Sequence, residues 1–137
     1  MAVCKLCGKL TLNNTNIYCS NKCQQHNQYL LYIKKWKAGS VSGSRGINTK
    51  NISRHLIRYL INKYGGKCSI CGWMGINPIT NRVPLEIDHI DGDSENNKEE
   101  NLRLLCPNCH SLTPNFRNLN IGNGRVWRQK KYLKNTI

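Results

Sequence analysis

Two neighbouring residues near the middle of the chain have side chains suited to metal-assisted hydrolysis. Asp88 offers a hard carboxylate oxygen of the kind that divalent cations prefer, and His89 offers an imidazole that can accept a proton near neutral pH. Adjacent residues of a strand point to opposite faces, so these two side chains suit different tasks. Because a base must keep its lone pair off the metal, the pattern favours Asp88 as ligand and His89 as base.

The acidic residues of the chain are confined to this neighbourhood. All seven Asp and Glu lie between Glu86 and Glu100, where Lys98 is the sole basic residue. The rest of the sequence therefore carries 20 of the 21 Lys and Arg, and the formal net charge is +14. Such an excess, with acids missing from whole segments, favours a phosphate backbone as partner over a merely solvated surface. The acidic stretch lacks the residue order of an EF-hand, which excludes that type of calcium site.

The eight cysteines form four close pairs. Residues 1–12 contain no apolar signal-peptide core, so we expect an intracellular protein, in which such pairs bind zinc rather than form disulfides. Two zinc ions, each held by four thiolates, would still leave a net charge of about +10. The sequence predicts one structural zinc site from Cys4, Cys7, Cys19 and Cys23, and a second from Cys68, Cys71, Cys106 and Cys109.

The second cysteine set flanks the acidic stretch. A zinc ion bound by both of its pairs would clamp the two ends of the candidate site together. A closed shell of four thiolates leaves no open coordination position, so this ion is expected to be structural and not catalytic. The first set is expected to be structural too, because a bound ion supplies folding free energy to a short segment.

Two amphipathic helices are predicted. Over residues 24–37, apolar and aromatic side chains recur at helical spacing, which favours a core face over a platform for stacking bases. Over residues 52–64, Leu56, Ile57, Leu60, Ile61 and Tyr64 are expected to point inward. Cationic candidates for phosphate contacts accompany both helices: Lys34, Lys35 and Lys37 at the end of the first, and Arg54 and Arg58 on the polar face of the second.

At this point the sequence resembles a known family. The order of Cys68 and Cys71, then DHIDGD, then NLRLLCPNCH is similar to the HNH endonucleases, in the branch that carries a Cys4 zinc site and occurs in phages and mobile elements. The resemblance implies an α+β fold: a small, zinc-stapled, treble-clef-like ββα-metal core with flanking helices. An N-terminal zinc-finger module lies outside the family pattern.

The resemblance also implies roles for particular residues. His89 would be the general base that activates water, and Asn101 would pin the loop that aims it. Asp88 and His110 would hold one catalytic divalent ion, Mg²⁺ or Mn²⁺. The expected activity is hydrolysis of phosphodiester bonds in double-stranded DNA. The alternative is a non-catalytic, zinc-dependent DNA-binding protein, which the acids beside His89 disfavour because carboxylates weaken DNA binding unless a metal offsets them. RNA as the substrate is a further alternative.

The expected organisation has four parts. These are an N-terminal zinc module with its basic helix (1–37), a basic linker (38–51), an HNH nuclease domain (52–125) and a basic tail (126–137). No segment has the length of a membrane span, and a cytoplasmic protein encoded by a phage or bacterium is expected. Monomer and homodimer, and nicking and double-strand cleavage, remain open. The remaining candidates for nucleic-acid contact are Arg45, Arg117, Arg125 and Arg128.

Overall fold

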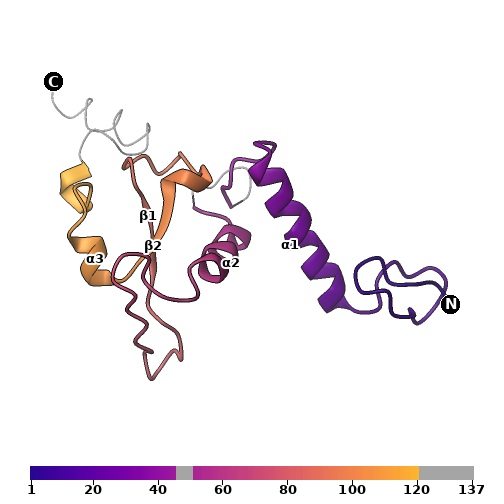
Figure 1. The fold of residues 1–137 in the computed structure, drawn as a ribbon. Coiled ribbons are helices and arrows are strands. Elements are labelled where there is room, and N and C mark those ends of the chain that lie inside the picture. Colours follow the sequence, from indigo (N-terminus) through magenta and orange to yellow (C-terminus); the bar gives the residue numbers. More distant parts are fainter. Residues whose placement is uncertain (46–50, 121–137) are drawn as a thin grey trace. The chain divides into compact units, whose positions relative to one another are not determined.

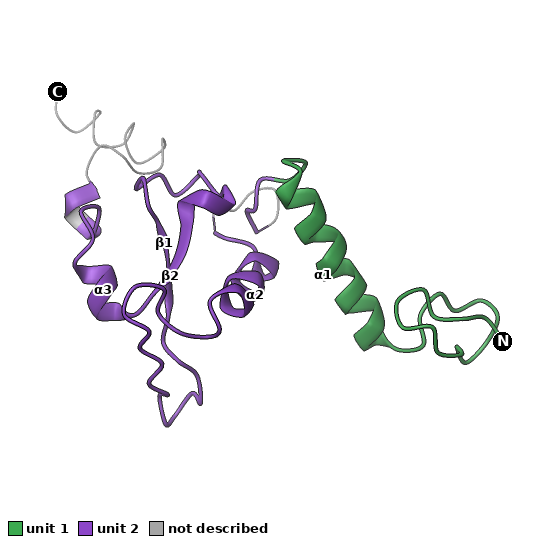
Figure 2. Cartoon of the chain, in the orientation of Figure 1, with its two compact units in different colours: residues 1–41 green, residues 42–137 purple. Residues whose placement is uncertain are grey.

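The computed structural model describes residues 1–45 and 51–120. The chain divides into two compact units, residues 1–41 (unit 1) and residues 42–137 (unit 2) (Figure 2). The predicted tail and the candidates Arg125 and Arg128 lie outside the described residues. Across the described ranges, none of the helices combines the length and the apolar character that crossing a membrane requires.

Unit 1 consists of a cysteine-bearing loop followed by helix α1 (Asn21–Lys37) (Figure 1). The helix begins three residues before the predicted start because the Ser20 hydroxyl caps it, accepting a hydrogen bond from the backbone N–H of Cys23 at 3.2 Å. Tyr29, Ile33 and Trp36 are buried. The aromatic stripe is therefore core, as its spacing predicted.

Unit 2 begins with helix α2 (Arg54–Lys63), which Ser53 caps. Leu56 and Leu60 are completely buried, as predicted. The prediction for Ile61 was wrong, since this side chain is 42% exposed. Successive helical residues are rotated by about 100°, which carries Ile61 off the stripe that Leu56 and Leu60 share.

A two-stranded antiparallel sheet forms the centre of unit 2. It pairs β1 (Glu86–His89) with β2 (Leu102–Leu105), in a register that sets Asp88 opposite Arg103 and His89 opposite Leu102. A 3-10 turn, η1 (Glu99–Asn101), leads into β2, whose Leu102, Leu104 and Leu105 are buried.

Helix α3 (Pro107–Ser111) follows β2 and contacts both strands, and the 3-10 turn η2 (Arg117–Asn120) comes after it (Figure 1). Cys106 caps α3, and Pro107 occupies its first turn, where a missing backbone N–H costs nothing. The order β1, β2, α3 is the ββα arrangement that the family resemblance implied within an α+β fold.

Candidate active site and metal centres

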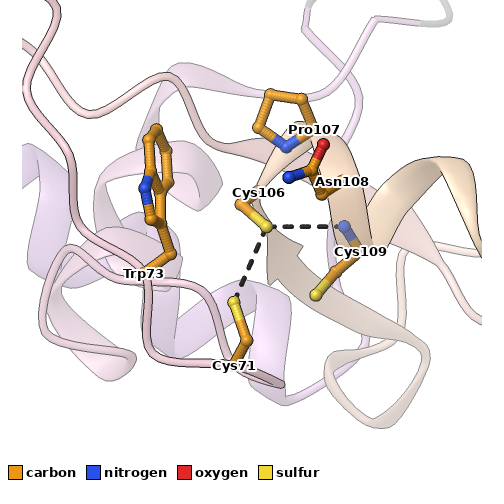
Figure 3. A pocket seen from close by; sticks show the side chains of 6 residues that line it. All are labelled: Cys71, Trp73, Cys106, Pro107, Asn108 and Cys109. Carbon is orange, nitrogen blue, oxygen red and sulfur yellow. Dashed lines mark hydrogen bonds between the residues drawn. The ribbon is translucent and has the colours of Figure 1, made fainter.

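The second cysteine set converges at the junction of β2 and α3. The sulfurs of Cys68, Cys71, Cys106 and Cys109 all lie within 4.8 Å of one another, and those of Cys71 and Cys106 are 3.7 Å apart (Figure 3). Four sulfurs placed tetrahedrally about 2.3 Å from one ion would be about 3.8 Å apart, so the group fits zinc. All four thiols are free of disulfides.

The first cysteine set converges in the same way within unit 1. The sulfur of Cys19 is 3.5 Å from those of Cys7 and Cys23, and Cys23 is 3.7 Å from Cys7. Cys4 completes a second group of four within 4.8 Å. The donor set again fits a tetrahedral zinc ion, and the helix α1 carries one of its ligands in its first turn.

The pKa values of the cysteines shift in opposite directions within each set, because the thiols share protons. The backbone N–H of Cys7 is the main cause that lowers the pKa of Cys4 to about 6. Burial raises the pKa of Cys68, but backbone N–H groups around its sulfur outweigh that effect and lower the pKa to about 6. Hydrogen bonds with neighbouring cysteine side chains raise the pKa of Cys19 and of Cys109 to about 12. A bound zinc ion would resolve this competition, because it would take the place of the shared protons.

The zinc knuckle is tied directly to the sheet. The backbone N–H of Ser69 donates to the carbonyl of Leu104 at 2.8 Å, and that of Cys68 donates to the carbonyl of Trp73 at 3.0 Å. Trp73 lines one pocket together with Cys71, Cys106 and Cys109 (Figure 3). A zinc ion here would therefore fix β2 and the start of α3, the elements that carry the candidate active site.

Asp88 is buried on β1 with one carboxylate oxygen engaged. Its side chain is 7% exposed, and its Oδ2 accepts a hydrogen bond from Nε of Arg103, the residue opposite in the sheet, at 2.7 Å. The guanidinium supplies the charge that a buried carboxylate needs. The other oxygen, Oδ1, faces His110, whose Nε2 is 3.9 Å away.

His110 projects from α3 toward β1. Its Nδ1–H donates to Oε2 of Glu86, so the second ring nitrogen, Nε2, is the one turned to Asp88. The ring of Phe116 packs edge-on against the imidazole, with centroids 5.3 Å apart. Two ligands bound at about 2.1 Å to one ion lie about 3.0 to 4.2 Å apart, so Asp88 Oδ1 and His110 Nε2 fit a shared Mg²⁺ or Mn²⁺.

His89 lies at the end of β1 and contacts a different partner from Asp88. Its Nε2 is 2.8 Å from Oδ1 of Asn97, a buried residue of the loop between the strands. With the amide oxygen of Asn97 as the acceptor, Nε2 of His89 is the donor in this hydrogen bond. The Nδ1 lone pair of His89 is then left to accept a proton.

Asn101 holds the loop that contains Asn97. Its Oδ1 accepts the backbone N–H of Asp91 at 2.9 Å, and its Nδ2 donates to Oδ1 of Asp91 at 2.9 Å and to the carbonyl of Asn96 at 2.8 Å. The Asn101 side chain is thus joined to both ends of the turn that begins just after His89.

The loop is reinforced by its own side chains. Burial raises the pKa of Asp91, but hydrogen bonds from Asn96, Asp93 and Asn101 and the nearby charge of His89 lower it overall. Gly92 has φ of +77°, and a Cβ there would lie 2.3 Å from Oδ1 of Asn120. The turn accordingly requires glycine at this position.

Of the four predicted side chains, the structure brings Asp88 and His110 together directly. His89 contacts Asn97, and Asn101 holds the loop that contains Asn97. Sequence reasoning missed Glu86, Asn97 and Arg103. Strand alternation from Asp88 predicts that Glu86 shares its face, a signal that was available. The strand register that pairs Arg103 with Asp88, and the loop path that brings Asn97 to His89, had no comparable local signal.

The predicted phosphate contacts are distributed over both units. Lys34, Lys35 and Lys37 are exposed in the last turns of α1, and Arg54 and Arg58 are exposed on α2. Arg45 and Arg117 are also exposed. Arg117 stands over the ring of Phe116 at 4.9 Å and lines an open pocket with Glu86 and His110.

Comparisons with known proteins agree with this geometry. The HNH endonuclease family model matches residues 68–115, which include both zinc-ligand pairs, the sheet and α3. The H-N-H endonuclease F-TflIV of Escherichia phage T5 is 48% identical over 59 residues, which are 41% of this chain and 24% of that protein. The chain thus spans about a quarter of the length of this relative. No solved structure matches significantly. Residues 68–115 of this chain therefore resemble an HNH endonuclease domain, by the family model and by the phage relative.

Proposed function

We propose that this chain is a metal-dependent endonuclease that hydrolyses phosphodiester bonds in double-stranded DNA. The observation that carries the proposal is the convergence of Asp88 Oδ1 and His110 Nε2, 3.9 Å apart, within the segment that matches the HNH endonuclease family model. His89 follows Asp88 at the end of the same strand. Carboxylate oxygen and imidazole nitrogen are donors that Mg²⁺ and Mn²⁺ accept, and two protein ligands leave most coordination positions to water and phosphate.

Asp88 and His110 would hold the ion. When bound, the ion supplies charge stabilisation at the scissile phosphate and at the leaving 3′ oxygen. Arg103 donates a hydrogen bond to Oδ2 of Asp88, so Oδ1 is the oxygen left to coordinate. Glu86 holds the Nδ1 proton of His110, which leaves the Nε2 lone pair for the ion.

His89 acts as the general base. Oδ1 of Asn97 accepts a hydrogen bond from Nε2 of His89, so Nδ1 is the nitrogen that takes a proton from the attacking water. Asn101 positions His89 indirectly, because it fixes the turn from Asp91 to Asn96 and thereby the position of Asn97. The family resemblance implies products with a 5′ phosphate and a 3′ hydroxyl.

DNA is the substrate that the charge distribution favours. Outside the stretch from Glu86 to Glu100 the sequence has no acid, and basic side chains are exposed on α1 and α2. Arg117 lines the pocket beside His110, where a guanidinium can contact a phosphate of the strand to be cut. Electrostatic attraction to the backbone then offsets the local repulsion by the acidic loop.

Supercoiled plasmid incubated with the zinc-loaded protein tests the proposal. We expect relaxation or linearisation when Mg²⁺ or Mn²⁺ is added and none when the ion is omitted. Omission is preferable to EDTA, since a chelator also strips structural zinc. Binding of plasmids of varied sequence without cleavage by either ion would favour a non-catalytic DNA-binding protein instead. An equal cleavage rate on duplex RNA would refute DNA specificity.

A further inference from the structure

The first half of α1 carries an exposed group of amide side chains that the nuclease chemistry does not use. Asn21, Gln24, Gln25 and Gln28 are all exposed, and within residues 1–45 and 51–120 none of their side chains has a hydrogen-bond partner. With about 100° per residue, all four fall within one face about 100° wide. The buried stripe of Tyr29, Ile33 and Trp36 borders this face and is centred about 100° around the helix from it. We name the four residues the amide face.

Apolar side chains border the amide face. Leu12 is 85% exposed and Ile17 is 61% exposed, and both line one open groove with Asn21 and Gln24. Both kinds of side chain contact water in the free protein, where exposed amides are well hydrated. They are well suited to a surface that offers paired hydrogen-bonding edges and methyl groups.

The charge of unit 1 identifies the class of partner. Residues 1–41 contain six lysines and no Asp or Glu. Lys34 and Lys35 lie about nine residues beyond Gln25 on α1, which places them roughly 14 Å further along the helix axis. A helix with amides near one end and lysines near the other can place the amides in a groove while the lysines reach a flanking phosphate.

We propose that α1 enters the DNA major groove and that its amide face reads A·T base pairs. Glutamine and asparagine form paired hydrogen bonds with N6 and N7 of adenine, and aliphatic groups contact the methyl group of thymine. The major groove is wide enough to admit one α-helix. The inference rests on duplex DNA being the partner in the proposed function, and it gives the N-terminal zinc module the role of choosing the site.

The zinc module provides the rigidity that this reading requires. Cys23 lies in the first turn of α1, between Asn21 and Gln24, so a zinc ion at the first cysteine set fixes the turn that presents the amides. The Ser20 cap holds the same turn. Amide side chains on an anchored turn lose less orientational freedom on binding than those on a frayed helix end.

The test measures both the sequence preference and the salt dependence of DNA binding. The full chain with His89→Ala, without Mg²⁺ or Mn²⁺, serves as the parent protein so that bound DNA is not cut. The parent is used to select duplexes from a random library, and its affinity is measured by fluorescence anisotropy across a salt series. We expect the selected duplexes to share A·T pairs. Combined replacement Gln24→Ala, Gln25→Ala and Gln28→Ala should reduce discrimination against G·C substitutions by about tenfold or more and leave the salt slope unchanged. Lys34→Ala with Lys35→Ala should weaken all duplexes alike and reduce the slope by about 2.

Controls separate recognition from folding and from cleavage. Alanine favours helix, and circular dichroism together with zinc content checks that each variant is folded. Leu30→Ala, on the far side of α1 and 45% exposed, should retain the preference of the parent. The inference is overturned if the glutamine variant keeps the selected preference, if it weakens every duplex equally, or if single-stranded RNA competes better than duplex DNA. If the wild-type protein cuts plasmid but one of these three results is obtained, the inference about α1 is refuted and the proposed nuclease activity is not. If the glutamine variant loses the preference but the wild-type protein never cuts plasmid, the proposed nuclease activity is refuted and the inference about α1 is not.

Discussion

Glu86→Gln tests whether the carboxylate behind His110 tunes the predicted metal site. The replacement keeps the length of the side chain and an oxygen that can accept the Nδ1 proton of His110, but it removes the negative charge. A carboxylate that holds the distal N–H of a metal-binding imidazole makes the other nitrogen a better donor. Its loss should therefore weaken ion binding without rearranging β1.

The expected loss of metal affinity depends on how exposed Glu86 and His110 are. Loss of such a partner costs about 10- to 100-fold in metal affinity, or roughly 1.4 to 2.8 kcal/mol. The side chain of Glu86 is 53% exposed and that of His110 is 25% exposed. Solvent screening at this exposure puts the expected loss near the lower limit, about tenfold.

Isothermal titration of Mn²⁺ into the zinc-loaded protein provides the measurement. Glu100→Gln is the matched control, because it makes the same charge change on an exposed residue of η1, away from His110. We expect the dissociation constant to rise about tenfold for Glu86→Gln and to change by less than about twofold for the control. An unchanged constant for Glu86→Gln, or an equal rise in both variants, would refute the proposed role of Glu86.

Three further predictions concern the loop and the zinc centre. Asn101→Ala removes three side-chain hydrogen bonds that hold the loop, so urea unfolding should show that the free energy of unfolding falls by about 3 kcal/mol. The kcat for plasmid cleavage should also fall while plasmid affinity stays constant. An unchanged kcat would exclude a role of Asn101 in positioning His89. Cys106→Ser should lower zinc content from two ions per chain to one, measured by atomic absorption, and two retained ions would contradict the assignment. Gly92→Ala should lower the thermal unfolding midpoint more than Gly65→Ala does. Both glycines have positive φ, but of the two only Gly92 has neighbouring atoms that an added Cβ would meet. Equal shifts in the midpoint would show that the contact with Asn120 is not what requires glycine at position 92.

The metal centres and the helix in unit 1 were predictable from the sequence because their signals are local. Paired cysteines at short spacing predicted two sets of four sulfurs, and both sets converge. The 3.6-residue spacing of Tyr29, Ile33 and Trp36 predicted the buried face of α1. Each of these features depends on residues that are close in sequence or on a ligand type that has few other uses.

The contacts that orient the candidate active site depend on tertiary pairing and were not predictable in this way. Arg103 reaches Asp88 only because the strands pair in one particular register, and a shift of one residue would turn it to the other face. Asn97 reaches His89 through the path of a loop whose turns are set by several polar side chains. The domain limits and the roles of Asp88, His89, Asn101 and His110 remain predictions.

Single-turnover cleavage of supercoiled plasmid by His89→Ala tests the central claim most directly. The wild-type protein, the variant and His26→Ala, which alters a histidine of unit 1, are compared with Mn²⁺ at equal zinc content. We predict that His89→Ala slows cleavage by at least about 100-fold at unchanged plasmid affinity, because the general base is lost, while His26→Ala cuts at the wild-type rate. Cleavage by His89→Ala at the wild-type rate would contradict the account.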